Sequence, residues 1–279
     1  MWCFKDGEFV RAEDLRISPF DHGYLYGLGF FETFRTYNGE LFLFAEHMQR
    51  MRAALATYRI KLPYTDVELK EVIRELTAKS NGEDGYFRLN VSAGDEGLGL
   101  QARTYENPTV IIFRKELPPV CREKSAVWLD TIRSQPEQTT RFKSHHYANN
   151  ILARQEVPSL KDLEGFYVTE QGNVAEGITS NIFWATNGRM YTPSLETGIL
   201  NGITRQFIME LARSLEIPLI EGLYRKEDVE QADECFVTTS IQEIVAIRKL
   251  GAKEFKGCDG EVYQQLYEAY QKRIEGLRL

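Results

Sequence analysis

The spacing of hydrophobic and polar residues in the first third of the chain predicts paired strands followed by helices. Asn38-Gly39 separates two strand-like runs, and this dipeptide is a strong hairpin signal because both residues readily adopt positive φ angles. Further on, Thr65 and Glu68 form a capping box, which marks the start of a helix. The elements predicted for this part are strands at 29–37, 40–44, 86–93 and 109–114, and helices at 45–59 and 66–79.

A proline pair then interrupts both patterns. Leu117-Pro-Pro-Val120 can continue neither a helix nor a strand ladder, because proline lacks the backbone N–H that both require. We therefore predict a linker at 117–123, between a small N-terminal domain (1–116) and a larger C-terminal domain (124–279).

The second part of the chain mixes strands and helices in a different order. Asn187-Gly188 marks another hairpin, and the segment that carries Lys143 is predicted to be helical. The other predicted elements are strands near 126–132, 165–169, 174–176, 180–185, 189–192 and 235–239, and helices near 202–215 and 261–275. These runs of strands and helices predict an α+β protein with two domains.

Charge and cysteine content argue against several classes of partner. The 279 residues carry 34 Lys and Arg against 41 Asp and Glu, a net charge of −7, which disfavours nucleic acid or an anionic membrane as the main partner. The four cysteines show no C-x-x-C spacing and the four histidines no paired ligand spacing, so we expect reduced thiols and no metal site. Charged residues near the start and the short apolar runs predict a cytoplasmic chain.

Several groups have the residue types needed for catalysis or anion binding, although each also has a plainer interpretation. Lys143 and Arg50, taken alone, are more often solvated charges. Gly202-Ile-Thr-Arg205 opens a helix, where N–H groups and a hydroxyl can cradle an anion, or it merely starts that helix. Thr238-Thr-Ser240 ends a strand with three hydroxyls. Glu176 lies between strand segments, where burial would demand a cationic or hydrogen-bonded partner.

Taken together, these groups match the requirements of pyridoxal phosphate. A lysine forms a Schiff base with this cofactor, a carboxylate keeps its pyridine nitrogen protonated, and its phosphate needs a cationic site rich in N–H donors. Lys143, Glu176, Arg50 and the helix start at Gly202 supply these three parts. The sequence contains no P-loop, no G-x-S-x-G and no H-E-x-x-H motif that would favour another chemistry.

Six blocks of the sequence occur in an order and at a spacing that is typical of one enzyme family. They are Phe20–Thr33, Glu46–Arg50, Lys143–Tyr147, Glu176–Asn181, Gly202–Arg205 and Thr239–Ser240. They resemble the fold-type-IV pyridoxal-phosphate enzymes, which include branched-chain and D-amino-acid aminotransferases and aminodeoxychorismate lyases. The resemblance spans nearly the whole chain. It implies a two-domain α+β fold of the D-amino-acid aminotransferase type, with a β-barrel-like C-terminal domain that carries helices, and it implies a homodimer.

The resemblance also implies a role for each matched residue. Lys143 forms the Schiff base with pyridoxal 5′-phosphate, and Glu176 contacts the pyridine nitrogen. Tyr147, expected one helical turn after Lys143, steadies the cofactor or the lysine. The residues expected to hold the phosphate are Arg50, Ile203 through its N–H, Thr204 and Ser240, and those expected beside the cofactor are Ser180 and Asn181.

Departures from the aminotransferase pattern favour a lyase. D-amino-acid aminotransferases typically read T-R-G near residue 93, where the arginine binds the substrate α-carboxylate, whereas this chain reads Ser92-Ala93-Gly94. It also has Phe31 where those enzymes commonly carry a tyrosine. The blocks 92–101 and 143–153 are similar to aminodeoxychorismate lyases of the Gram-positive type. The resemblance therefore implies 4-amino-4-deoxychorismate as substrate, with pyruvate and 4-aminobenzoate as products.

In such a lyase, Lys143 is the expected general base for the ring proton, and Thr33 or a water is the expected general acid. Phe31, Arg88 and Arg103 are the expected substrate-binding residues, the two arginines for the substrate carboxylates.

Two other interpretations stay open at this point. One is an aminotransferase of D- or branched-chain amino acids, which would need another arginine in place of the one absent at Ala93. The other is a non-catalytic dimer that binds the cofactor or acts as a scaffold. The presence of both Lys143 and Glu176 counts against this second alternative, because a silent protein needs neither.

Overall fold

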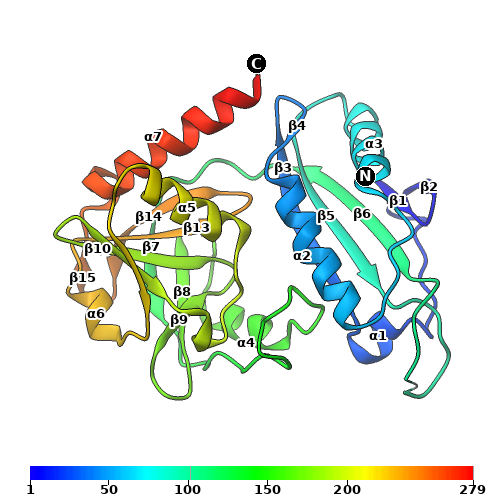
Figure 1. The fold of residues 1–279 in the computed structure, drawn as a ribbon, viewed down its shortest axis with the longest axis horizontal. Helices are drawn as coiled ribbons and strands as arrows, with labels where there is room; N and C mark the ends of the chain where they lie inside the picture. Colours follow the sequence, from blue (N-terminus) through cyan, green and yellow to red (C-terminus); the bar gives the residue numbers. More distant parts are fainter. Residues whose placement is uncertain (101, 279) are drawn as a thin grey trace. The chain divides into compact units, whose positions relative to one another are not determined.

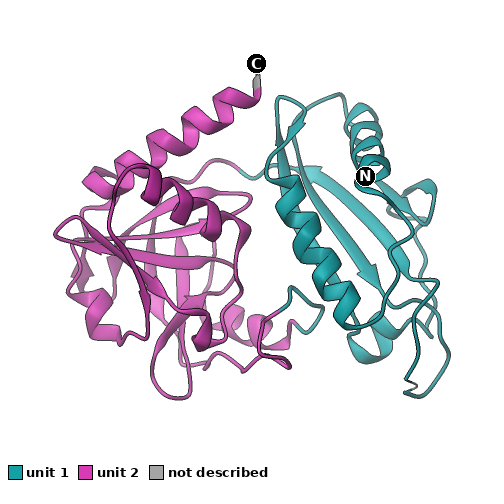
Figure 2. Ribbon diagram, viewed as in Figure 1, with its two compact units in different colours: residues 1–118, 142–146 teal, residues 119–141, 147–279 magenta. Residues whose placement is uncertain are grey.

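The computed structural model describes residues 1–100 and 102–278, so Gln101, the last residue of the 92–101 block, lies outside the described residues. The chain forms two compact units (Figures 1 and 2). Unit 1 comprises Met1–Pro118 and Phe142–His146, and unit 2 comprises Pro119–Arg141 and Tyr147–Leu279. Both units combine sheets with helices, so the predicted α+β class is confirmed.

Unit 1 is built on a six-stranded antiparallel sheet in the order β2-β1-β6-β5-β3-β4. Its elements are β1 (Trp2–Lys5), β2 (Glu8–Arg11), α1 (His22–Tyr26), β3 (Gly29–Tyr37), β4 (Glu40–Leu41), α2 (Phe44–Thr57), α3 (Asp66–Ala78), β5 (Gly85–Ser92) and β6 (Thr109–Glu116). Helices α2 and α3 cover one face of this sheet (Figure 1) and bury Met48 and Leu69 against Phe34 and Phe87.

The local signals in unit 1 act as predicted. Asn38 and Gly39 adopt φ angles of 52° and 85° in the turn between β3 and β4, and such angles are cheap for these two residue types. At the start of α3, the Glu68 N–H donates to Thr65 Oγ1 at 3.2 Å and the Thr65 N–H donates to Glu68 Oε2 at 2.7 Å. The predicted hairpin and capping box are therefore confirmed.

Alternation along β3 separates two sets of side chains. Phe34 packs edge-on against Phe44 of α2, so the even-numbered residues of the strand face the helices. Phe31 and Thr33 point to the opposite face, because successive side chains of a strand alternate. This division places Glu32 beneath α2 and leaves Phe31 on the face that the helices do not cover.

Unit 2 is built on a nine-stranded sheet that runs β12-β11-β10-β13-β14-β7-β8-β9, with β15 beside β14. Its strands are β7 (Glu123–Trp128), β8 (Leu163–Val168), β9 (Val174–Gly177), β10 (Asn181–Thr186), β11 (Arg189–Pro193), β12 (Leu219–Gly222), β13 (Glu234–Thr239), β14 (Glu243–Leu250) and β15 (Lys253–Glu254). Its helices are α4 (Ala148–Glu156), α5 (Ile203–Ser214), α6 (Lys226–Glu230) and α7 (Glu261–Glu275), and the short 3-10 turns are Leu195–Thr197, Gly257–Asp259 and Gly276–Arg278.

The large sheet curls until its two ends meet. The Val174 N–H at the start of β9 donates to the carbonyl of Tyr224, two residues after β12, at 2.8 Å. Strands β9 and β12 lie at opposite ends of the strand order, so this bond joins the two edges of the sheet. The sheet therefore has the barrel-like form that was predicted, with a core that includes Trp184, Phe166 and Val237.

The segment around Lys143 differs from the prediction. Helix α4 begins at Ala148, and residues 142–146 instead run along the edge of β3 in unit 1. The Phe31 N–H donates to the Lys143 carbonyl at 2.9 Å, and the His145 N–H donates to the Gly29 carbonyl at 2.8 Å. Lys143 is thus not helical, Tyr147 does not follow it by one helical turn, and by its contacts Lys143 belongs to unit 1 rather than to the C-terminal domain.

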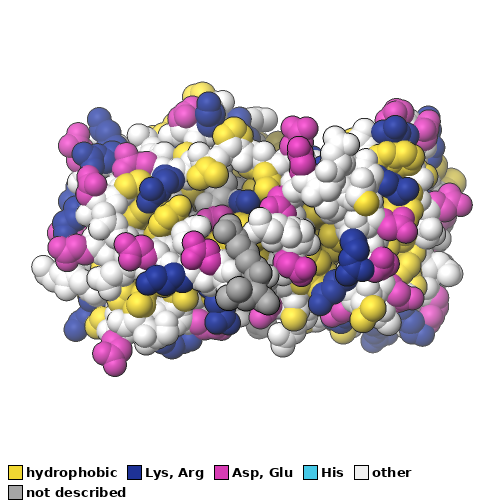
Figure 3. All heavy atoms as spheres, turned by 90° about the horizontal axis from the view of Figure 1, so that it is seen from above, with side chains coloured by type: hydrophobic (Ala, Val, Ile, Leu, Met, Phe, Trp, Pro, Cys, Tyr) yellow, Lys and Arg dark blue, Asp and Glu magenta, His cyan; other side chains and the backbone are white. Residues whose placement is uncertain are grey.

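Within the described residues, no helix is long and apolar enough to cross a membrane, and no cluster of His, Cys, Asp and Glu could hold a metal ion. All four cysteines are free thiols. On the face shown in Figure 3, acidic and basic side chains are interspersed, so this face offers no continuous basic surface.

Candidate active site

Lys143 lies beside an aromatic ring on the open face of the unit 1 sheet. Its ammonium nitrogen is 4.8 Å from the centroid of the Phe31 ring, and the Arg88 guanidinium carbon is 3.7 Å from the same centroid. Thr33 is the residue directly opposite Arg88 in the β3–β5 register, two positions along the strand from Phe31. Four of the predicted catalytic and substrate-binding residues therefore share this face, and two of them are cations within reach of one ring.

His145 forms the other border of this aromatic site. Its ring stacks on Phe31 with centroids 6.3 Å apart, and a Cβ at Gly29 would lie 2.4 Å from the imidazole, so only glycine allows this approach. Burial, together with the Arg88 charge, lowers the pKa of His145 to about 4. The imidazole is therefore neutral at pH 7 and adds no third positive charge beside Lys143 and Arg88.

This low pKa predicts a loss of stability in mild acid. Between the ordinary pKa of 6.5 and the folded value of about 4, the unfolded chain gains a proton that the folded chain does not, so stability falls as the pH falls. Linkage gives about 2 kcal/mol lost at pH 5. His145→Gln should flatten this part of the curve, which urea unfolding at pH 7.5 and pH 5 would measure; parallel curves for both proteins would contradict the assignment.

Arg50, the predicted phosphate ligand on α2, belongs to a buried polar network beneath the same sheet. Its Nε donates to Glu32 Oε1 and its Nη2 donates to Glu32 Oε2, both at 2.7 Å. His47 Nδ1 lies 2.6 Å from Glu32 Oε2, and it must be the donor because an ionised carboxylate only accepts. Neither Glu32 nor His47 was singled out from the sequence, since no local pattern links β3 to α2.

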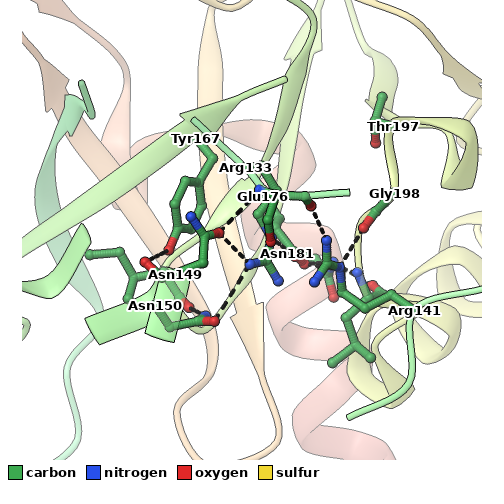
Figure 4. Close-up of polar contacts among 12 residues, drawn as sticks. Arg133, Arg141, Asn149, Asn150, Tyr167, Glu176, Asn181, Thr197 and Gly198 are labelled. Atoms are coloured by element: carbon green, nitrogen blue, oxygen red, sulfur yellow. Dashed lines mark hydrogen bonds and ion pairs between the residues drawn. The ribbon is translucent and has the colours of Figure 1, made fainter. Parts of the chain in front are cut away.

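In unit 2, Glu176 on β9 forms a buried ion pair. Arg133 Nε donates to Glu176 Oε1 at 2.8 Å, and the two side chains are 6% and 7% exposed (Figure 4). Arg133 Nη1 also donates to Asn149 Oδ1 at 2.8 Å, and its guanidinium lies 5.1 Å from the Tyr167 ring centroid. Burial of Glu176 was predicted to require a cationic partner, and Arg133 is that partner.

The second oxygen of Glu176 has two N–H donors. The backbone N–H of Leu200 donates to Oε2 at 3.1 Å, and Asn181 Nδ2 donates to it at 3.4 Å (Figure 4). A carboxylate offers about four acceptor sites, so with Arg133 on the other oxygen one acceptor position can still receive a protonated ring nitrogen. The donor set around Glu176 thus fits its predicted role toward a pyridine nitrogen.

Arg141, two residues before Lys143, is fixed in unit 2. Its Nε donates to the Gly198 carbonyl at 2.5 Å, and its Nη2 donates to the carbonyl of Ser134 (Figure 4). Burial and the nearby Arg133 charge lower the pKa of Arg141. The chain passes from this anchor into the Lys143 segment and then returns to unit 2 at Tyr147, directly before α4.

The start of α5 has the form of an anion site. Gly202 occupies the N-cap and provides no side-chain cap for the helix, so the first N–H groups, from Ile203 onward, have no intrahelical acceptor. Thr204 Oγ1 lies 3.4 Å from Ser240 Oγ, just past the end of β13. Two hydroxyls and the positive end of a helix dipole therefore converge, as a phosphate group requires.

Two glycines allow the close packing of this region. A Cβ at Gly202 would lie 2.1 Å from Asn181 Oδ1, and a Cβ at Gly177 would lie 2.0 Å from Ser180 Oγ. Asn181 and Ser180 are both 5% exposed. These two residues are therefore buried within unit 2 next to the Glu176 strand and the α5 start, which is where a cofactor contact is predicted.

Arg103, the second predicted carboxylate ligand, is engaged elsewhere in unit 1. Its Nη2 donates to the Glu96 carbonyl at 2.7 Å and lies 2.6 Å from Glu96 Oε2. Arg88 differs, because its Nε donates to Asn90 Oδ1 at 3.1 Å and its guanidinium lies over Phe31. Of the two arginines, Arg88 is therefore the better candidate for binding a substrate.

The predicted site residues thus fall into two groups. In unit 1 they are Lys143, Phe31, Thr33, Arg88, Arg103 and Arg50, and in unit 2 they are Glu176, Tyr147, Ser180, Asn181, Ile203, Thr204 and Ser240. Within each unit, the structure brings together residues that are far apart in the sequence. That both groups serve one active site stays a prediction.

A comparison with known proteins assigns the family. Residues 29–250 match the model of the amino-transferase class IV family. The chain belongs to this family. It is 40% identical over 278 residues to the aminodeoxychorismate lyase of Bacillus subtilis (strain 168), covering 98% of this chain and 95% of that one.

Solved structures show the same fold. The Escherichia coli branched-chain amino acid aminotransferase is 28% identical, with a TM-score of 0.86 over 97% of this chain and 93% of that chain. The branched-chain amino acid aminotransferase of T.th., 24% identical with a TM-score of 0.87 over 99% and 94% of the two chains, is complexed with N-(5′-phosphopyridoxyl)-L-glutamate. The fold-type-IV prediction is confirmed, the chain is an enzyme of this family, and its cofactor is pyridoxal 5′-phosphate.

Proposed function

We propose that this enzyme is a 4-amino-4-deoxychorismate lyase, which releases pyruvate and forms 4-aminobenzoate for folate biosynthesis. The observation that carries the proposal is the state of position 93. Ala93 is fully buried in the core of unit 1, and its N–H donates to the Leu28 carbonyl at 3.0 Å. This position therefore offers no group for an α-carboxylate, which an amino-acid transaminase must bind next to the reacting amine.

The similarity to the Bacillus subtilis lyase supports the same conclusion, because it extends over nearly the full length of both chains. The lyase substrate also explains why Ala93 is acceptable. Its amine is attached to a ring carbon, and its two carboxylates lie farther from the reacting atoms. A carboxylate ligand is therefore needed at some distance from the amine, and Arg88 on the Phe31 ring can serve.

The cofactor, when bound, supplies an electron sink for the negative charge that forms when a proton leaves the substrate. Glu176 holds a proton on the pyridine nitrogen, and Arg133 and the Leu200 N–H keep this carboxylate ionised and in place. The α5 start, with Ile203, Thr204 and Ser240, and Arg50 of unit 1 bind the phosphate.

Lys143 acts as the general base in the proposed reaction. Its amine takes the ring proton from the amine-bearing carbon of the substrate, and the C–O bond to the enolpyruvyl group then breaks. The ring becomes aromatic, which makes this step strongly favourable, and the enolpyruvyl group leaves as pyruvate. Thr33, opposite Arg88 on the sheet face of Phe31, is our candidate for donating the proton to the leaving oxygen.

Replacing Arg88 tests the substrate site. Because a charge-assisted bond to a carboxylate contributes about 1.5–3 kcal/mol, Arg88→Gln should raise KM for 4-amino-4-deoxychorismate about 10- to 100-fold, with a smaller effect on kcat. Arg103→Gln is the matched control, because Arg103 is bound to Glu96 and should change KM less than threefold, a ratio of about 0.7 kcal/mol. Steady-state kinetics of both variants decide the matter, and a larger effect from Arg103 would reverse the assignment.

The alternative is an aminotransferase of D- or branched-chain amino acids, and the similarity to the Escherichia coli enzyme favours keeping it in view. A direct comparison separates the two activities. The holoenzyme is given either 4-amino-4-deoxychorismate alone or D-alanine or L-leucine with 2-oxoglutarate, and 4-aminobenzoate or the new 2-oxo acid is measured. The proposal requires the first kcat/KM to be the larger by about 100-fold or more, about 3 kcal/mol in transition-state binding. The reverse order would establish the aminotransferase.

A non-catalytic scaffold is the alternative of another class. Lys143 and the Glu176–Arg133 pair argue against it, because a buried ion pair next to a cofactor site is costly to keep without use. We also propose that the enzyme is a cytoplasmic homodimer, as its resemblance to the fold-type-IV enzymes implies. Sedimentation of the holoenzyme at twice the mass of one chain is the expected result.

A further inference from the structure

Arg50 is held by a carboxylate that has no role in the proposed reaction. Glu32 on β3 accepts from two nitrogens of Arg50, Nε and Nη2, through both of its oxygens at 2.7 Å. This two-bond arrangement fixes the plane of the guanidinium as well as its position, which a single bond does not. The Arg50 side chain is 14% exposed and Glu32 is 1% exposed, so water competes little for these bonds.

His47 completes the arrangement. It donates from Nδ1 to Glu32 Oε2 at 2.6 Å and is 2% exposed. Burial alone would raise the pKa of Glu32, but the charge and the bonds of Arg50, with the bond from His47, lower it to about 2. Burial lowers the pKa of His47, so this imidazole is neutral at pH 7. The network therefore holds one negative and one positive charge at any physiological pH.

The geometry determines which part of Arg50 can meet a ligand. A guanidinium carries five N–H bonds in one plane, and Glu32 takes the Nε–H and one Nη2–H. The remaining three N–H bonds, two on Nη1 and one on Nη2, point away from Glu32. They form a second flat edge, which suits two oxygens of a phosphate.

We propose that Glu32 is a positioning residue that orients Arg50 toward the cofactor phosphate, and that it thereby sets how strongly the chain prefers pyridoxal 5′-phosphate to pyridoxal. The proposal rests on the proposed phosphate role of Arg50, but it does not depend on the lyase reaction. It predicts an effect on the phosphate alone, because Glu32 lies on the α2 side of β3 and Phe31 and Lys143 do not.

Two effects of Glu32 oppose each other. Its negative charge weakens the field of Arg50 at the phosphate, whereas its two bonds keep the guanidinium in the orientation that the phosphate needs. Orientation is the larger effect for two reasons. The carboxylate lies on the far side of the guanidinium from the outer edge, and its charge is shared with His47 as well as with Arg50.

The test uses the full-length chain from which the cofactor has been removed, titrated with pyridoxal 5′-phosphate and, separately, with pyridoxal. Glu32→Gln removes one acceptor oxygen and places an NH2 against a donor of Arg50 or His47. It should weaken binding of pyridoxal 5′-phosphate about 10-fold while changing pyridoxal binding less than twofold, ratios of about 1.4 and 0.4 kcal/mol. Asp66→Asn is the matched control, because it breaks an exposed arginine–carboxylate pair, the one that Asp66 forms with Arg52 of α2.

Glu32→Asp separates orientation from charge. It keeps the negative charge, but its shorter side chain cannot reach both nitrogens of Arg50. It should therefore lose the preference for the phosphate as Glu32→Gln does, and because it retains the charge it also guards against the case in which the glutamine variant does not fold. In an Arg50→Ala background, neither substitution at Glu32 should change the preference further.

Each outcome decides the proposal. Equal loss of affinity for both ligands in Glu32→Gln would mean that Glu32 only supports the fold. An unchanged preference in Glu32→Asp, or a stronger one in Glu32→Gln, would mean that Glu32 acts through its charge, and either result would overturn the positioning role. A wild-type chain that binds both ligands equally would remove Arg50 from the phosphate site and the proposal with it.

Discussion

Lys143→Ala should reduce 4-aminobenzoate formation to the background rate, a loss of about 10³-fold or more. The lysine is both the covalent attachment point and the general base, so its removal abolishes two functions at once. The fold should persist, because the segment is held against β3 through the Lys143 carbonyl, which accepts from the Phe31 N–H at 2.9 Å, and alanine keeps that carbonyl. Steady-state assay and far-UV circular dichroism measure the two parts of this prediction.

The visible absorption of the covalently bound cofactor should disappear in the same variant. Lys61→Ala is the control, since Lys61 is 64% exposed and pairs with Glu106 at the surface of unit 1. It should keep the absorption and the rate of the wild type. Full activity in Lys143→Ala would remove the lysine from the site and, with it, the assignment of the residues around Phe31.

Glu176→Gln should lower kcat about 100-fold, because a neutral amide cannot hold the proton on the pyridine nitrogen and the electron sink is weakened. The structure adds a second effect. Arg133 loses its charged partner while 6% exposed, and breaking such a buried pair costs about 3 kcal/mol or more of stability. The variant should therefore be slow and also less stable, which kinetics and urea unfolding measure separately.

The two effects of Glu176 can be separated in a double variant. Arg133→Met combined with Glu176→Gln removes the buried charge altogether, so it should recover much of the lost stability. It should remain as slow as Glu176→Gln, because the carboxylate is still absent. Recovery of the rate along with the stability would show that Glu176 acts only by binding Arg133, and that it has no part in the chemistry.

Local sequence signals predicted much of the fold because they act over a few residues. Asn38-Gly39 forms its turn through backbone conformations that these residues favour, and Thr65 and Glu68 cap α3 through bonds three residues apart. Helix α7 begins and ends where its apolar spacing begins and ends. Predictions of this kind need no knowledge of the rest of the chain.

The Lys143 segment could not be predicted in the same way. Apolar and polar residues at helical spacing follow it directly, and nothing in residues 142–146 indicates that they would lie along β3, more than 100 residues earlier in the sequence. Partners of the site residues were missed for the same reason. Arg133 is 43 residues from Glu176, and Glu32 is 18 residues from Arg50 on a different element. The need for a partner was visible in the sequence, but its identity depends on the tertiary fold.

The central claim is that this family member is a lyase, and the most direct test is to mix the holoenzyme with 4-amino-4-deoxychorismate and no 2-oxo acid. Fluorescence of 4-aminobenzoate follows the product, and the number of product molecules per subunit is counted. Our account predicts many turnovers per subunit, since a lyase needs no amino acceptor. The absence of product from a preparation that shows the normal cofactor absorption would contradict it, and would point to an aminotransferase whose carboxylate site is not at Ala93.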